Sequence, residues 1–245
     1  MKSLLIAMFI ASPAFAAENK PAPRDLAVPM EVSVGSFEED AAGVWDKVRQ
    51  LIGESRTKRY GREISKAIAK HDPVSAQRAL DEMLKNNPEI KTKEPYAINY
   101  HQGNINFWKK DFKGAYKEYS TIVKALELKY PNGVPPGGKY SEINAYFMSD
   151  AYFGRAASLL QLKKYPEAVE DLDKAISVTP HKRAALYVNK CRALFKMKEY
   201  GAAAESLDLA YGVTPIAVDS AQDKKHICEI FAKKSVQSKA CSQEK

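Results

Sequence analysis

The sequence predicts an all-α fold, namely a right-handed α-solenoid of helix–turn–helix repeats with flanking N- and C-terminal helices. Three observations support it: a segment that recurs 35 residues later, turn-forming residues between apolar helical stretches, and a final amphipathic stretch able to cover the last unit. One such unit cannot bury its apolar face alone, so the recurrence predicts a stack of like units. The matched positions are Tyr152, Arg155, Ala156, Leu159, Tyr165, Ala168, Leu172, Ala175 and Pro180, then Tyr187, Lys190, Cys191, Leu194, Tyr200, Ala203, Leu207, Ala210 and Pro215.

Residues 1–16 have the pattern of a secretory signal peptide. Lys2 precedes an apolar run over residues 4–11, and Ala14 and Ala16 give the small-residue spacing of a cut after Ala16. The apolar run is shorter than the roughly 20 residues that span a bilayer. We therefore expect the mature protein to be periplasmic or secreted.

The segment before the repeats divides into two parts. Residues 17–35 are rich in proline and charge, which predicts a flexible leader. Residues 36–56 predict an N-terminal helix, because Ser36 and Glu39 form a capping box before apolar residues spaced three and four apart. We expect Trp45 in this helix to cover the open end of the stack.

The repeat domain is predicted over residues 57–215, with about four repeats. In the first copy, Asp72 is expected to cap the second helix and Pro73 to occupy its first position. In the second copy, Gly103 is expected where the helices cross closely, and Phe112 in the turn.

An extension is predicted between the second and third repeats. The Pro- and Gly-rich segment 131–138 must be a loop, while the helix before it and the helix over residues 141 to about 163 exceed the repeat length. The extra turns predict a protruding helical finger near 124–147. Its apolar side chains would either dock a partner or pack against one another; they are Leu126, Tyr130, Ile143, Tyr146 and Phe147.

Residues 216–245 predict a C-terminal capping helix, from about residue 217 to 234, followed by a polar tail. Three cysteines in an oxidising compartment allow one disulfide and leave one thiol. Cys191 falls where the repeat favours a small buried residue, so Cys228 and Cys241 are the candidate pair that ties the tail to its helix. Pairing of Cys191 with Cys228 remains open.

The formal net charge is +8, and removal of Lys2 with the signal peptide leaves +7. This charge favours acidic partners. The basic residues are dispersed, and an exported chain leaves most nucleic acid behind, so we expect no nucleic-acid partner. Dispersed basic residues are equally typical of ordinary solvated helices.

The repeats resemble the tetratricopeptide repeat (TPR) family, whose unit is a 34-residue helix–turn–helix. The last two copies carry the small residue at the crossing (Ala156, Cys191) and the aromatic residue in the turn (Tyr165, Tyr200). The first copy departs from the pattern, because Pro73 replaces that aromatic residue. The resemblance implies a stack with a concave groove lined by the first helix of each repeat, and a role in protein binding.

By this resemblance, one face of each first helix lines the groove. Aromatic anchors and Arg are the residues that binding hot spots favour, although an aromatic stripe is also consistent with core packing. Some family members hold a terminal carboxylate with paired lysines that this chain lacks at the matching positions. The candidate partner-binding residues are Tyr100, Asn104, Phe107, Trp108, Phe153, Asn189, Arg192, Phe195 and Lys196.

No spacing of the four histidines assembles a metal site or a nucleophile–base pair, and no phosphate-binding glycine loop is present. The sequence therefore predicts no enzyme, cofactor or metal. It predicts an exported scaffold or adaptor that binds a protein or peptide segment in the groove and serves cell-envelope assembly, secretion or maintenance. The alternatives are docking or self-association through the finger, as a homo-oligomer or in a larger envelope complex, and, more remotely, a glycan-binding or enzymatic role.

Overall fold

The structure is a computed structural model that describes residues 56–93, 95–138, 141–179, 181–215 and 223–242. The predicted signal peptide, leader and nearly all of the N-terminal helix lie outside these residues. The described part is all-helical and contains no strand. Its helices are α2 (Arg56–Ala69), α3 (Pro73–Asn86), α4 (Ile90–Lys93), α5 (Pro95–Trp108), α6 (Phe112–Lys129), α7 (Ser141–Gln161), α8 (Tyr165–Val178), α9 (Ala184–Lys196), α10 (Tyr200–Val213), α12 (Lys224–Lys233) and α13 (Lys239–Ser242).

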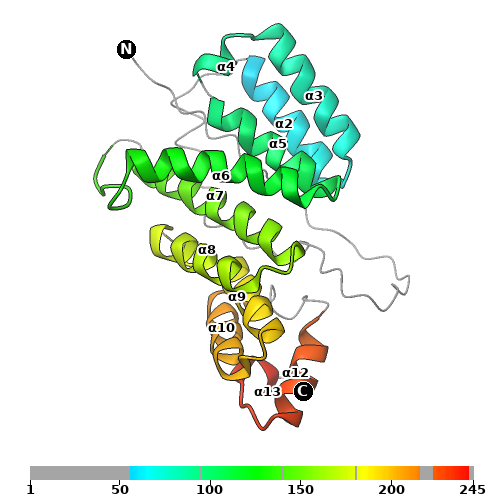
Figure 1. The fold of residues 1–245 in the computed structure, drawn as a ribbon, viewed down its shortest axis with the longest axis vertical. Coiled ribbons are helices and arrows are strands. Elements are labelled where there is room, and N and C mark those ends of the chain that lie inside the picture. Colours follow the sequence, from blue (N-terminus) through cyan, green and yellow to red (C-terminus); the bar gives the residue numbers. More distant parts are fainter. Residues whose placement is uncertain (1–55, 94, 139–140, 180, 216–222, 243–245) are drawn as a thin grey trace.

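Four helix pairs are built around the same turn: α2–α3, α5–α6, α7–α8 and α9–α10 (Figure 1). In each turn, one residue adopts a positive φ of 57–66°, and the next residue donates its N–H to a carbonyl five positions back. This hydrogen bond ends the first helix with a helix C-terminal motif. The positive-φ residues are His71, Lys110, Lys163 and Lys198, and the donors are Asp72, Asp111, Lys164 and Glu199, with N–O distances of 2.9 Å.

Small residues let the two helices of each pair approach closely. The first buried alanine of each second helix has no exposed surface in all four pairs, at Ala76, Ala115, Ala168 and Ala203. The ring of Tyr119 fills the space beside Gly103, where a Cβ atom would lie 3.0 Å from the ring's Cζ atom. These contacts account for the recurrence in the sequence, since a larger residue would separate the helices.

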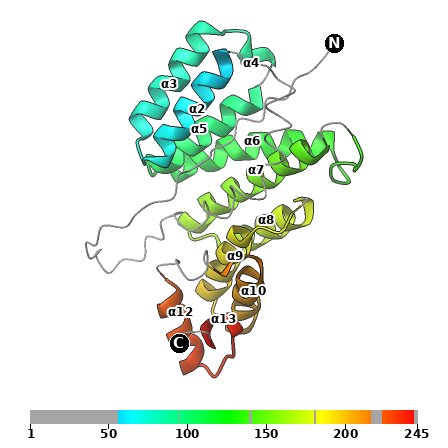
Figure 2. The ribbon, with the colours of Figure 1, turned by 180° about the vertical axis from the view of Figure 1, so that it is seen from behind.

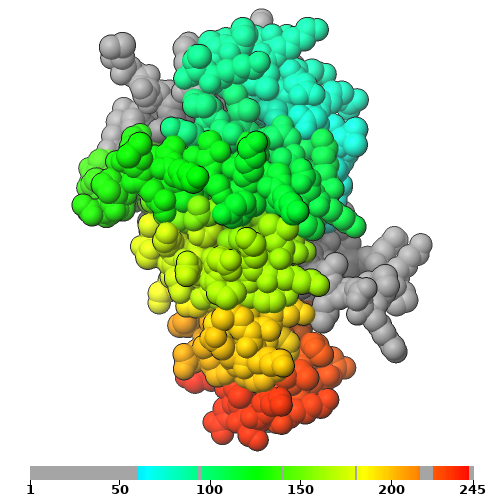
Figure 3. All heavy atoms as spheres, viewed as in Figure 1, coloured from blue at the N-terminus to red at the C-terminus, as the bar shows by residue number. Residues whose placement is uncertain are grey.

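The hairpins follow one another along the long axis of the molecule in chain order (Figures 1, 2 and 3). Contacts of α6 with α7 and of α8 with α9 join successive hairpins. The C-terminal end is covered by α12, whose Ile227 and Phe231 are buried against α9 and α10. The fold is therefore the predicted stack of TPR-like helix pairs.

The apolar side chains of the predicted finger are largely buried. Leu126, Ile143, Tyr146 and Phe147 have at most 8% of their surface exposed. The ring of Phe147 lies 5.8 Å from that of Tyr100 on α5, so the extended ends of α6 and α7 pack on the preceding repeat. Leu126 and Phe147 belong to the main apolar core. Of the two alternatives left by the sequence, packing therefore describes these four buried side chains.

Part of the predicted polar tail forms the short helix α13. The carboxylate of Asp208 on α10 accepts hydrogen bonds from Ser238 Oγ (2.6 Å) and Ala240 N (2.9 Å). Asp208 thus holds the start of α13 against the last repeat.

Candidate protein-interaction face

The candidate residues lie on α5, α7 and α9, the first helices of three successive hairpins. Contacts join α5 to α7 and α7 to α9, so the three helices line the same side of the stack. We call the nine candidate residues on these helices the groove face. The side chains on this face differ in how far they are buried.

On α5, the two residues nearest the core stabilise their own repeat. Asn104 is buried; its Nδ2 donates to the carbonyl of Tyr100 (3.1 Å), and its Oδ1 accepts from the Tyr119 hydroxyl (2.9 Å). Phe107 is buried edge-to-face against Phe112, with ring centroids 5.3 Å apart. Burial raises the pKa of Tyr100, and the nearby carboxylate of Asp150 raises it further.

Trp108 ends α5 and is half-buried. Its ring stacks on that of His71, 4.1 Å away, in the turn of the preceding hairpin. The stack joins the first two hairpins and leaves part of the indole accessible.

A buried ion pair lies where α7 meets α9. Arg183, the N-cap of α9, places Nη1 2.6 Å from Asp150 Oδ1 and its guanidinium over the ring of Phe153. Phe153 is only 8% exposed. Burial raises the pKa of the Asp150 carboxyl, while the charge of Arg183 opposes that rise.

On α9, Asn189 and Arg192 are buried. Asn189 Nδ2 donates to the carbonyl of Ala185 (2.9 Å). The guanidinium of Arg192 binds both oxygens of Asp223 at the start of α12 (2.6 and 2.7 Å), while its Nη1 is buried without a hydrogen-bond partner. Arg192 therefore joins α12 to the last repeat, a role that the sequence did not predict.

The remaining two residues of α9 are more accessible. Phe195 is half-buried among the rings of Tyr200, His226 and Phe231, at centroid distances of 5.5–6.0 Å. Lys196 is exposed. Three groove-face side chains can thus meet a partner without rearrangement, namely Trp108, Phe195 and Lys196. Tyr100 is only partly exposed, because its ring packs against Tyr119 and Phe147.

Sequence reasoning missed Arg183 and Asp223 as partners of groove-face helices. Each ion pair joins residues about one repeat apart in the chain, 33 positions for Asp150–Arg183 and 31 for Arg192–Asp223. An acid and a base separated by one repeat length could have indicated an interface between successive hairpins, because equivalent positions are neighbours in a stack.

The C-terminal cysteines are joined as the candidate pair. Cys228 on α12 and Cys241 on α13 form a disulfide with Cα atoms 5.5 Å apart, and Cys191 is a buried free thiol. Burial raises the pKa of the Cys191 thiol to about 12, so it carries almost no thiolate at neutral pH.

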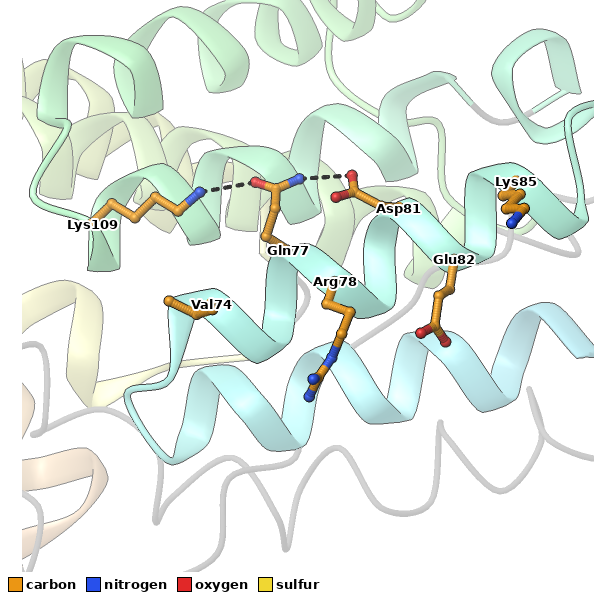
Figure 4. Close-up of a pocket in the computed structure, with 7 residues that line it drawn as sticks. All are labelled: Val74, Gln77, Arg78, Asp81, Glu82, Lys85 and Lys109. Atoms are coloured by element: carbon orange, nitrogen blue, oxygen red, sulfur yellow. Dashed lines mark hydrogen bonds between the residues drawn. The ribbon is translucent and has the colours of Figure 1, made fainter.

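A shallow depression of about 400 Å³ lies along α3, a site that the sequence did not indicate (Figure 4). Lys109 Nζ donates to Gln77 Oε1 (3.1 Å), and Gln77 Nε2 donates to Asp81 Oδ1 (3.1 Å), so its polar groups bind one another. The lining residues are Val74, Gln77, Arg78, Asp81, Glu82, Lys85 and Lys109.

Within the described ranges, no group of three or more His, Cys, Asp or Glu side chains is placed to hold a metal ion. None of the described helices is both long and apolar enough to cross a membrane.

Among known proteins, no family model and no curated protein matches the chain. The chain is similar to a solved structure described as the TPR2AB domain:pHSP90 complex of yeast Sti1, with 21% identity and a TM-score of 0.30. The match covers 82% of this chain and 93% of that one. At that distance the match carries no argument about a site, and the fold follows from the four hairpins themselves.

Proposed function

We propose that this protein is an exported, non-catalytic scaffold that binds a segment of another protein along its groove face. The observation that carries the proposal is the pair of partly exposed aromatic side chains on the first helices of the second and fourth hairpins, Trp108 on α5 and Phe195 on α9. Large aromatic residues beside a cation, here Lys196, are typical of binding hot spots. A segment laid along a helical groove is a common recognition mode.

Two features support export. Residues 1–16 have the signal-peptide pattern, and Cys228 and Cys241 form a disulfide of the kind that persists in oxidising compartments. An exported scaffold would serve assembly, secretion or maintenance of the cell envelope. Cell fractionation with N-terminal sequencing tests export, and we expect a mature chain that starts at Ala17.

Site-specific photocrosslinking tests the groove face. A crosslinking residue placed at position 108 or 196 is expected to capture the same protein in cells. Position 209 serves as the control, because Leu209 on α10 is 54% exposed and lies outside the groove face. Equal capture of that protein from position 209, or capture of none from 108 and 196, would contradict the proposal.

Substitutions then test which side chains bind. Trp108→Ala and Lys196→Glu are expected to weaken binding of the captured protein about tenfold or more, while Lys182→Glu, an equal charge change at an exposed site, leaves it unchanged. Arg192 is unsuitable for this test, because its loss would leave Asp223 without its bidentate partner.

A second candidate is docking through the extended ends of α6 and α7. One side chain there, Leu128, is 86% exposed although apolar. Leu128→Asp adds a charge without touching the buried Leu126 or Ile143. An unchanged oligomeric state and an unchanged set of partners in this variant would dispose of the second candidate.

A further inference from the structure

Lysines gather on the turns within the four hairpins. Every one of these turns carries at least one exposed lysine, and three of the four carry two or more. We call this set the lysine edge. Its members are Lys70 in the first turn, Lys109, Lys110 and Lys113 in the second, Lys163 and Lys164 in the third, and Lys196 and Lys198 in the fourth.

The topology places these turns on one side of the molecule. Antiparallel hairpins that stack side by side alternate their connections, so turns within hairpins lie on one edge and connections between hairpins on the other. In Figure 1, the α2–α3, α5–α6 and α7–α8 turns lie on the right, and the long α6–α7 connection lies on the left. Lysines far apart in the sequence thereby lie on the same edge of the stack.

Carboxylates offset only part of the charge on this edge, because Asp72, Asp111 and Glu199 lie in the same turns as the lysines. Two of the acidic side chains in the turns cap the following helix: Asp72 accepts from Ser75 N (3.0 Å), and Asp111 accepts from Gly114 N (2.9 Å). Of the lysines, Lys109 has a hydrogen bond to Gln77, a neutral partner. The lysines still outnumber the carboxylates in the second, third and fourth turns, whereas Asp72 offsets Lys70 in the first turn.

Lysine is also a costly choice at three of these positions. Lys110, Lys163 and Lys198 have φ of 60–66°, the left-handed region where helix ends normally use glycine. The backbone strain of a side chain there costs roughly 1–2 kcal/mol, of which a part is offset because glycine loses more conformational entropy on folding. The sequence thus places charge on this edge at positions where folding alone would favour glycine.

We propose that the lysine edge binds a flexible linear polyanion, a polymer with regularly spaced phosphate or carboxylate groups. Helix axes pack 8–10 Å apart, so turns of successive hairpins lie roughly 20 Å apart, beyond the Debye length of about 8 Å at physiological salt. A small anion therefore meets one turn only, whereas a polymer gains from binding several turns at once. Each unit of a solenoid is rotated relative to the one before it, so the edge is twisted. A polymer that bends can follow this edge better than a flat bilayer can.

Binding assays on the whole mature chain, with long-chain polyphosphate and with polygalacturonate as probes, test this proposal. The edge variant Lys110→Gln/Lys163→Gln/Lys198→Gln is compared with Lys91→Gln/Lys124→Gln/Lys182→Gln, which removes equal charge from exposed sites elsewhere. For the polymer that wild type binds more tightly, we expect the affinity of the edge variant to be at least about tenfold lower than that of wild type. In this variant, the magnitude of the slope of log affinity against log salt concentration should be smaller by about two to three.

A glycine version of the edge variant separates charge from folding. Lys110→Gly/Lys163→Gly/Lys198→Gly removes the same charges while relieving the positive-φ strain, so it should fold at least as stably and still bind weakly. The two polymers distinguish phosphate from carboxylate as the preferred group. Equal weakening by the control variant, unchanged binding of the edge variant, or edge-dependent binding of anionic vesicles in place of both polymers would each overturn the proposal.

Discussion

Gly154 and Gly212 are both helical glycines, but their surroundings differ. A Cβ atom at Gly154 would overlap the ring of Tyr119, whereas a Cβ atom at Gly212 meets nothing within 4 Å. We predict that Gly154→Ala lowers the free energy of unfolding by about 1–3 kcal/mol through overpacking. Gly212→Ala should raise it by up to about 1 kcal/mol through helix propensity.

Urea denaturation followed by circular dichroism measures both changes. The pair is matched, since each variant adds the same methyl group to a helix. Equal effects of the two substitutions would show that Tyr119 does not set the approach of α7 to α6.

His101 is a fully buried base in α5, and burial lowers its pKa to about 4. The unfolded chain binds this proton with a pKa near 6.5, so the unfolded state holds more protons between pH 6.5 and 4. Stability is therefore fully present above pH 6.5 and is lost as the pH falls toward 4, by roughly 3 kcal/mol from this group.

Urea denaturation of wild type and His101→Gln at pH 8, 6, 5 and 4 measures whether stability falls with pH as predicted. The variant starts from lower stability at pH 8 but should lose less between pH 6.5 and 4. A parallel decline of wild type and His101→Gln would contradict the assignment.

Each hairpin turn depends on one residue with a positive φ, which in the second hairpin is Lys110. Glycine lacks the Cβ atom that disfavours this conformation, so Lys110→Gly is predicted to raise the free energy of unfolding by about 0.5–1 kcal/mol. Lys117→Gly, at an exposed site within α6, should lower it by about 1 kcal/mol. Thermal unfolding measures both variants. If Lys110→Gly also destabilises the protein, the positive φ at position 110 does not favour glycine.

The elements themselves were largely predictable, and the exceptions have local causes. Asp72 and Pro73 mark the start of α3 as expected, because a cap and a first-turn proline act through neighbouring backbone. The short helices α4 and α13 were missed, since a single turn has too little periodicity to detect. The burial of Phe147 was left open, because its contact with Tyr100 joins different repeats.

In the whole molecule, the Cys228–Cys241 disulfide closes the C-terminal cap. The bridge spans 13 residues and, on the chain-entropy estimate, contributes about 3 kcal/mol. Solenoid stability is local, so Cys228→Ala/Cys241→Ala should loosen α12 and α13 far more than α5. Amide hydrogen exchange should show faster exchange confined to residues 223–242. A uniform increase along the chain would contradict a local role.

The groove face shows where sequence reasoning reached its limit. The resemblance to TPR repeats placed the nine candidates on three neighbouring first helices, and the structure has them there. Spacing did not reveal that Phe153 lies beneath Arg183 or that Arg192 binds Asp223. The role of the nine candidate residues in partner binding stays a prediction, and so does the export of the chain.

The sequence by itself determined the hairpins and the small residues between them, because helix periodicity, caps and close crossings depend on residues a few positions apart or one repeat apart. Only the tertiary structure decided which groove-face side chains remain accessible and that lysines from successive hairpin turns share one edge. Both depend on how successive hairpins approach and orient, and that is set by long-range packing and by ion pairs such as Asp150–Arg183.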